Sequence, residues 1–153
     1  MAEGLLASRL ARVTSLNDPE VRAFLQQGTR TGKLGYLSSS GRPLVTPIWF
    51  IVDGDSLVFN TGAETAKGRA LIRDPRAVLC VDLEEPPYGF VQVQGEVELS
   101  EDPAELLRTA TAIAGRYMGA EQAEEFGRRN AVPGELVVRL RPTRILAAFD
   151  LTG

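Results

Sequence analysis

The stretch that decides the fold spans residues 33–52 and has the sequence KLGYLSSSGRPLVTPIWFIV. Two β-rich runs flank residues 39–43, which are of the Ser, Gly and Pro types that favour a turn. The pattern therefore predicts a β-hairpin. Residues 53–55 turn the chain again into a third run at 56–60, which extends the hairpin to a three-strand meander.

Outward from this meander, the sequence alternates further strand and helix signals. Strands are predicted at 76–83, which is apolar and β-branched, at 90–99, where apolar and polar residues alternate, and at 135–140 and 144–149. Short helices are predicted after Asn17-Asp18-Pro19 and over 64–73, a long amphipathic helix from Asp102-Pro103, and a polar turn at 121–130.

Strands in hairpin order, with helices inserted late, favour an antiparallel architecture over a doubly wound parallel sheet. The fold class we predict is mainly β (β+α), a six- to seven-stranded antiparallel barrel with peripheral helices. No Gly-x-Gly-x-x-Gly follows a strand, so a Rossmann dinucleotide site is not supported. A length of 153 residues, 44% of them hydrophobic, suits one domain over 1–153.

Charge and hydropathy exclude two classes of partner. A net charge of -3 gives no basic footprint for nucleic acid. No apolar run approaches the ~20 residues that span a bilayer, so no membrane partner is expected. Residues 1–10 lack the basic and apolar regions of a signal peptide, and we expect a cytoplasmic protein.

The chain contains no histidine and a single cysteine, Cys80. Histidine-dependent nucleophilic triads, zinc sites and haem ligation by histidine are therefore excluded, and no metal site is predicted. Cys80 lies in an apolar run and is predicted to be a buried thiol. The chemistry must rely on carboxylates or on a bound cofactor.

The segment 59–71, FNTGAETAKGRAL, has the composition of an anion-binding turn. Thr61 and Thr65 offer hydroxyls, a helix start offers free N–H groups, and Lys67 and Arg69 offer positive charge, which together suit a phosphate. A capped turn followed by solvated cations, with no ligand, is the alternative.

Pro47 and Trp49 each allow two interpretations. Pro47 cannot donate to a central ladder, so it marks an edge strand, a bulge or a backbone that faces a ligand. Trp49 is the only tryptophan, and it either packs in a core or interface or contacts a cofactor.

Four motifs in order carry a resemblance to a known family. They are Ser40-Gly41-Arg42-Pro43, Val45-Thr46-Pro47-Ile48-Trp49-Phe50, Thr65-Ala66-Lys67-Gly68-Arg69 and Arg73-Asp74-Pro75-Arg76. With them the chain resembles the split-barrel flavin-binding superfamily of pyridoxamine 5'-phosphate oxidase over residues 32–99. It is most similar to the deazaflavin-dependent reductase branch.

The resemblance implies a split β-barrel homodimer with a cofactor across its interface. The cofactor ring is expected against Thr46, Pro47, Ile48 and Trp49, with Gln92 near the pocket. The phosphate is expected at the turn, where Lys67 makes the direct contact; the other expected cofactor-binding residues there are Asn60, Thr61, Thr65, Ala66 and Arg69.

The resemblance also implies an oxidoreductase. The basic segments that pyridoxamine phosphate oxidases use for FMN and substrate are missing, so coenzyme F420, a deazaflavin, is the expected cofactor and FMN the alternative. The expected reaction is hydride transfer from reduced F420 to a conjugated, electron-poor small organic acceptor, with no catalytic side chain assigned. Two alternatives stay open: an FMN-dependent oxidoreductase, and a non-catalytic carrier of a flavin or tetrapyrrole.

Overall fold

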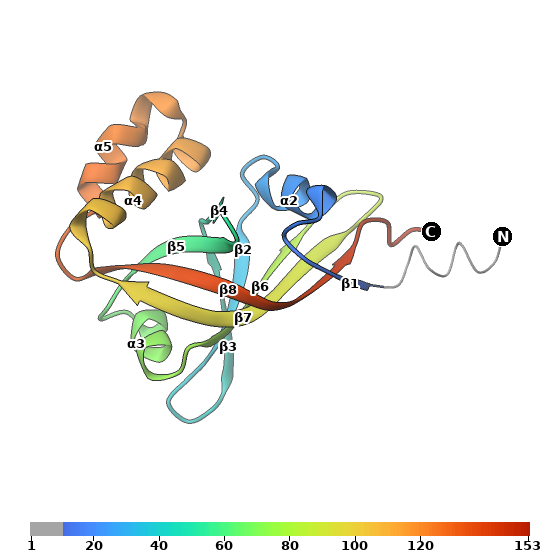
Figure 1. Ribbon diagram of the computed structural model, residues 1–153, viewed down its shortest axis with the longest axis horizontal. Coiled ribbons are helices and arrows are strands. Elements are labelled where there is room, and N and C mark those ends of the chain that lie inside the picture. The colour runs from blue at the N-terminus through green and yellow to red at the C-terminus, as the bar shows by residue number, and fades with distance from the viewer. Residues whose placement is uncertain (1–10) are drawn as a thin grey trace.

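The computed structural model describes residues 11–153, and its eight strands there belong to one antiparallel sheet (Figure 1). The order across the sheet is β3-β2-β6-β7-β8-β5-β4, and β1 pairs with β8. The strands are β1 (Arg12–Thr14), β2 (Gly32–Leu37), β3 (Pro43–Ile48), β4 (Ile51–Asp53), β5 (Ser56–Gly62), β6 (Arg76–Asp82), β7 (Phe90–Ser100) and β8 (Glu135–Ala148). The sheet and its helices confirm the split-barrel β+α fold class.

Four helices of the described range surround this sheet, and three of them begin at a side-chain cap. They are α2 (Pro19–Gln26), α3 (Ala66–Arg73), α4 (Pro103–Met118) and α5 (Ala120–Asn130). Asp18, Thr65 and Asp102 accept backbone N–H bonds at the starts of α2, α3 and α4, which satisfies donors that a helix start leaves free. No helix of the described range is long and apolar enough to cross a membrane.

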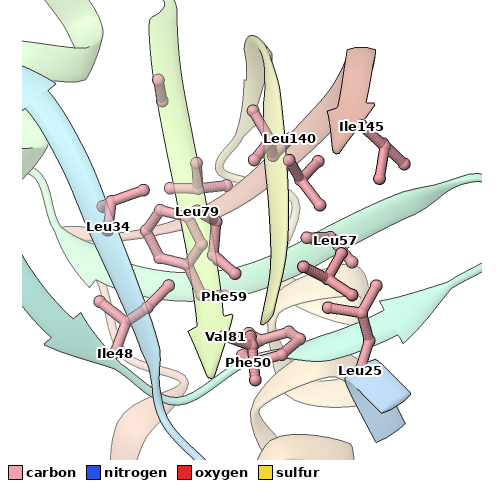
Figure 2. Close-up of a cluster of buried hydrophobic side chains, with 14 of the residues drawn as sticks. Leu25, Leu34, Ile48, Phe50, Leu57, Phe59, Leu79, Val81, Leu140 and Ile145 are labelled. Carbon is pink, nitrogen blue, oxygen red and sulfur yellow. The ribbon is translucent and has the colours of Figure 1, made fainter. Parts of the chain in front are cut away.

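The core lies between the faces of the curled sheet and is closed by α2 (Figure 2). Phe50, Phe59, Leu79 and Leu140 are among its fully buried side chains, and Leu25 of α2 packs into the same cluster. Alternation along β6 and β7 sends one set of side chains inward and leaves the other on the outer face of the sheet. The outward-facing side chains form the outer face of the sheet, which contains Gln92.

Two predicted segments are wrong. The polar turn predicted at 121–130 is the helix α5, whose buried residue Gly127 packs against Thr111 of α4. Contact with α4 stabilises this helix, and such a contact cannot be recognised in a polar sequence. The strands predicted at 135–140 and 144–149 are one strand, β8. Pro142 interrupts neither the strand nor the sheet because it lies at a β-bulge opposite Gly95.

Smaller differences concern edges and burial. The run predicted as one strand at 44–52 divides into β3 and β4, because the chain leaves the ladder at residues 49 and 50. Strand β1 was not predicted.

Cys80 is half-buried rather than buried, since its side chain lies on the outer face of β6. Burial raises the pKa of its thiol, which keeps it protonated. The expectation for residues 1–10 lies outside the described residues.

Candidate functional site

The turn between β5 and α3 is held by threonine hydroxyls. Thr65 Oγ1 accepts from Gly68 N (3.1 Å) and donates to Gly62 O (2.7 Å), and it lies 3.1 Å from Oγ1 of the buried Thr61. The hydroxyl hydrogen of Thr65 is therefore committed to the backbone. The two hydroxyls shape the turn, and the free donors lie one residue further on.

Those free donors are the first N–H groups of α3. Within residues 11–153, no acceptor meets the N–H of Ala66 or of Lys67. Unpaired N–H groups at a helix start, together with the positive end of the helix dipole, favour an anion. The Lys67 side chain adds a full positive charge at the same place.

Gly68 allows this helix start to approach the strand so closely. A Cβ atom at Gly68 would lie 2.1 Å from Gly62 O, and real Cβ atoms do not come that close to a carbonyl oxygen. The predicted motif thus needs glycine here for steric reasons, and the position of the free N–H groups depends on it.

Lys67 and Glu135 face each other without closing an ion pair. Neither side chain makes a hydrogen bond or salt bridge within the described range, and both are half-buried. Glu135 begins β8 opposite Gly62 of β5. Burial raises the pKa of the Glu135 carboxyl, and the charge of Lys67 offsets only part of that rise.

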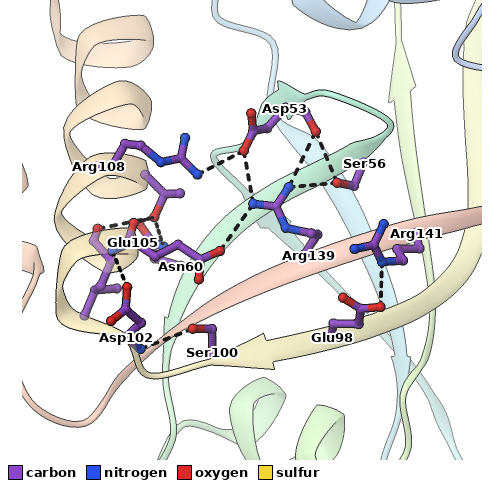
Figure 3. Close-up of polar contacts among 12 residues, drawn as sticks. Asp53, Ser56, Asn60, Glu98, Ser100, Asp102, Glu105, Arg108, Arg139 and Arg141 are labelled. Atoms are coloured by element: carbon purple, nitrogen blue, oxygen red, sulfur yellow. Dashed lines mark hydrogen bonds and ion pairs between the residues drawn. The ribbon is translucent and has the colours of Figure 1, made fainter.

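A pocket of about 230 Å³ opens on the other side of Glu135. Its lining combines the end of β3, β5 and α4: Ile48, Trp49, Asn60, Ala110, Ile113, Ala114, Asn130 and Glu135. Asn60 is fixed because its Nδ2 donates to Thr109 Oγ1 of α4 at 3.1 Å (Figure 3). Glu135 both lines this pocket and lies close enough to Lys67 for their charges to interact, so it links the pocket to the turn.

Trp49 is 43% exposed and stacks on Tyr117 of α4, with ring centroids 5.0 Å apart and planes at 2°. The Tyr117 hydroxyl donates to Arg30 O (2.9 Å) and accepts from Phe50 N (3.3 Å). Burial raises the pKa of this hydroxyl, so it stays a donor. Trp49 is thus partly exposed, is held by its stacking on Tyr117, and lines the pocket.

The remaining predicted residues lie outside the lining of this pocket. Pro47 lies on the edge strand β3, where its missing N–H leaves no gap in the ladder, and Thr46 is its half-buried neighbour. Gln92 lies on the outer face of β7 and lines a different hollow of about 590 Å³. Arg69 forms an exposed ion pair with Glu64 (2.9 Å).

The sequence did not single out Glu135, Tyr117 or Asn130 as site residues. The one sequence feature that could have identified Glu135 is its position as a single acidic residue after Pro133-Gly134, at the start of an apolar strand. Tyr117 was assigned to the apolar face of its helix, a position that the structure confirms in part.

Comparison with known proteins identifies the family. The model of the pyridoxamine 5'-phosphate oxidase family matches residues 18–148. Among solved structures, the chain is similar to a conserved hypothetical protein of Mycobacterium tuberculosis (24% identity, TM-score 0.76, covering 88% of this chain and 85% of that one). It is also similar to an F420 reductase (26% identity, TM-score 0.62, covering 83% and 97%).

A third similar structure is a heme binding protein of Mycobacterium smegmatis (22% identity, TM-score 0.69, covering 88% of this chain and 54% of that one), a similarity that concerns the fold alone. No curated protein sequence matches the chain. The family match extends over most of the chain. The chain therefore belongs to the pyridoxamine 5'-phosphate oxidase family, whose split-barrel fold binds flavin-type cofactors.

Proposed function

We propose that this protein is a coenzyme F420-dependent oxidoreductase that works as a homodimer. It transfers a hydride from the reduced deazaflavin to a conjugated, electron-poor small organic acceptor. The family match and the 26% identity to an F420 reductase support an oxidoreductase of this kind. FMN is the competing cofactor on the same fold.

The observation that carries the proposal is the open turn at Lys67. Its ammonium group and the N–H groups of Ala66 and Lys67 have no partner within residues 11–153, and together they match the oxygens of a phosphate group. Thr61 and Thr65 hold the turn in shape. Arg69 would come to the phosphate only by leaving Glu64.

The ring of the cofactor would lie toward the edge strand and the pocket. Thr46 and Pro47 offer an edge backbone, and Ile48, Trp49 and Asn60 line the pocket beyond it. A bound reduced deazaflavin supplies the hydride. These residues orient the reacting partners and exclude water, which is the protein's usual share in cofactor chemistry.

A homodimer would use the outer face of the sheet. The hollow of about 590 Å³ there is lined entirely by strand residues, among them Val78 and Gln92, and Val45 on the neighbouring strand is 71% exposed. Pairing this face with its copy would cover apolar surface and bring Gln92 toward the partner's site. Val45→Asp should yield a species of one-chain mass by light scattering; Ile72→Asp, an exposed change on α3, should leave the dimer intact.

The proposal is tested by binding and by turnover. We expect fluorescence titration to show saturable binding of F420, and reduced F420 to be oxidised in the presence of quinone, nitro or enone acceptors. Binding of FMN with no binding of F420 would replace the proposal with an FMN-dependent oxidoreductase. Tight F420 binding without turnover on the whole acceptor panel would identify a carrier.

A further inference from the structure

We infer that Glu135 selects the coenzyme by the charge of its phosphate, admitting a singly charged phosphodiester and disfavouring a doubly charged phosphate monoester. The inference rests on the proposed function, because it concerns the same turn. It goes further by naming a residue that distinguishes a deazaflavin coenzyme, whose phosphate is a diester, from FMN, whose phosphate is a terminal monoester.

The position of Glu135 supports this role. A Cβ atom placed on Gly62, the last residue of β5 before the turn, would lie 3.4 Å from Glu135 Oε1. The carboxylate therefore borders the anion-binding turn itself. It also lines the pocket that holds Trp49 and Asn60, so a ligand that runs from pocket to turn must pass beside it.

The charges around Glu135 explain the selectivity. Among the described residues, Lys67 of α3 is the cation that faces Glu135, and Glu101, which precedes α4, lines a second hollow together with Glu135. Asn60 and Asn130 are neutral, and the residues of α4 at the pocket are apolar. Arg69 is paired with Glu64 and directed to solvent. One cation and one anion leave the turn with little net charge beyond the partial charge of the helix start.

A site of that charge accepts a single negative charge more readily than two. A phosphate monoester carries about −1.5 to −2 at pH 7, whereas a diester has one ionisable oxygen. Each ligand charge is repelled by the Glu135 carboxylate, at a cost of at least about fourfold in affinity, the value for two charges about 5 Å apart in the dielectric of water. The penalty for FMN is therefore about the square of the penalty for the deazaflavin.

The half-buried setting of Glu135 makes the selection depend on pH. Its pKa is already raised by burial, against the opposing effect of Lys67, and a bound anion raises it further. Acidification neutralises the carboxyl and also removes the second charge of a monoester, whose second pKa is about 6. The preference for the diester should therefore shrink as the pH falls.

The experiment compares Glu135→Gln with the wild-type protein and with Glu124→Gln. Gln keeps the shape of the side chain and removes its charge, while Glu124 is an exposed acid on α5 that removes the same formal charge elsewhere. Dissociation constants for F420 and FMN are measured by fluorescence at pH 7.5, and for the wild-type protein also at pH 5.5.

We expect Glu135→Gln to tighten FMN binding more than F420 binding, shifting the ratio of their dissociation constants by roughly fourfold toward FMN, and Glu124→Gln to leave the ratio unchanged. The wild-type ratio should move the same way at pH 5.5, a result that needs no variant to fold. Equal changes for both coenzymes in Glu135→Gln would overturn the role of Glu135. Failure of F420 to bind any of the proteins would instead contradict the proposed function.

Discussion

Two polar clusters of this protein contain the same kinds of residue and differ in whether the chain completes them. The closed cluster joins α4 to the sheet through Arg139, whose guanidinium contacts Ser56 (2.9 Å), Asp53 (3.0 Å) and Glu105 (3.3 Å) (Figure 3). The open cluster is Lys67 with Glu135, which lie near each other without a hydrogen bond. Each region combines a half-buried or buried cation with carboxylate oxygen.

This difference between the two clusters indicates which polar groups are available to bind a ligand. In the closed cluster Arg108 adds a further bond to Asp53 at 3.2 Å, so the carboxylate has protein partners on more than one side. In the open cluster the ammonium of Lys67 and two backbone N–H groups donate to no acceptor within residues 11–153. Charged groups that a fold buries in part and leaves unpaired are costly, and the binding function proposed above would account for that cost.

The largest effect is expected when the open cluster is displaced from its strand. Gly68→Ala should lower the free energy of unfolding by about 3 kcal/mol, because its Cβ would meet Gly62 O, and backbone must move to relieve the overlap. Chemical denaturation measures this change. Gly115→Ala in α4 is the matched control: its Cβ meets only Ala123 of α5, at an ordinary 3.6 Å, so it should be neutral or stabilising by up to about 1 kcal/mol.

A smaller loss is expected when the closed cluster is broken. Arg139→Met should lower the free energy of unfolding by about 2 kcal/mol, since Arg139 is only 18% exposed and its removal leaves two carboxylates without that partner. Arg141→Met removes an arginine of the same strand that is 48% exposed, and should cost less than about 1 kcal/mol. Equal losses in the two variants would contradict the distinction drawn for Arg139.

The two clusters should respond to acid with opposite signs. Burial alone would raise the pKa of Asp53, but hydrogen bonds from Arg139 and Arg108 outweigh it and lower that pKa. Its contribution to stability is therefore present above the unfolded value of about 3.9 and is lost as the pH falls through the folded pKa. Glu135 has a raised pKa, so a cost to stability is relieved at higher pH, as the pH falls from that raised folded pKa to the unfolded value of about 4.3.

Stability curves between pH 6 and pH 2 measure this contrast. The fall in the free energy of unfolding below about pH 4 should be shallower in Arg139→Met than in the wild-type protein, by about 1 kcal/mol over the range. Glu135→Gln should instead remove the gain in stability that the wild-type protein shows at higher pH, as the pH falls toward the unfolded glutamate value of about 4.3. Identical curves for all three proteins would show that neither carboxyl is coupled to folding.

The sequence predicted the parts of the fold that depend on local patterns. The hairpins β2–β3 and β4–β5, the alternation in β7 and the caps Asp18, Thr65 and Asp102 follow from periodicity and residue type alone, but β3 and β4, predicted as one strand, lie at opposite ends of the sheet order. Helix α5 was missed because its stability comes from contact with α4, with Gly127 against Thr111. Such packing leaves no periodic apolar signal in the sequence.

The candidate site divides in the same way. Thr61, Thr65 and Lys67 were identified because they are neighbours in sequence and share one turn. Glu135 comes from β8 and reaches the turn only through its register with Gly62, and Tyr117 reaches Trp49 across the molecule. Gln92, in contrast, was placed with the site by family resemblance, and the single chain holds it on the outer face.

The central claim, that Lys67 and the turn before it bind the phosphate of the coenzyme, is tested most directly by a two-by-two titration. F420 and its phosphate-free deazariboflavin analogue are titrated into the wild-type protein and into Lys67→Ala, with Arg73→Ala, an exposed cation at the other end of α3, as the control. The wild-type and Arg73→Ala proteins should prefer F420, and that preference should fall roughly tenfold or more in Lys67→Ala. A preference for F420 that survives unchanged in Lys67→Ala would contradict the account.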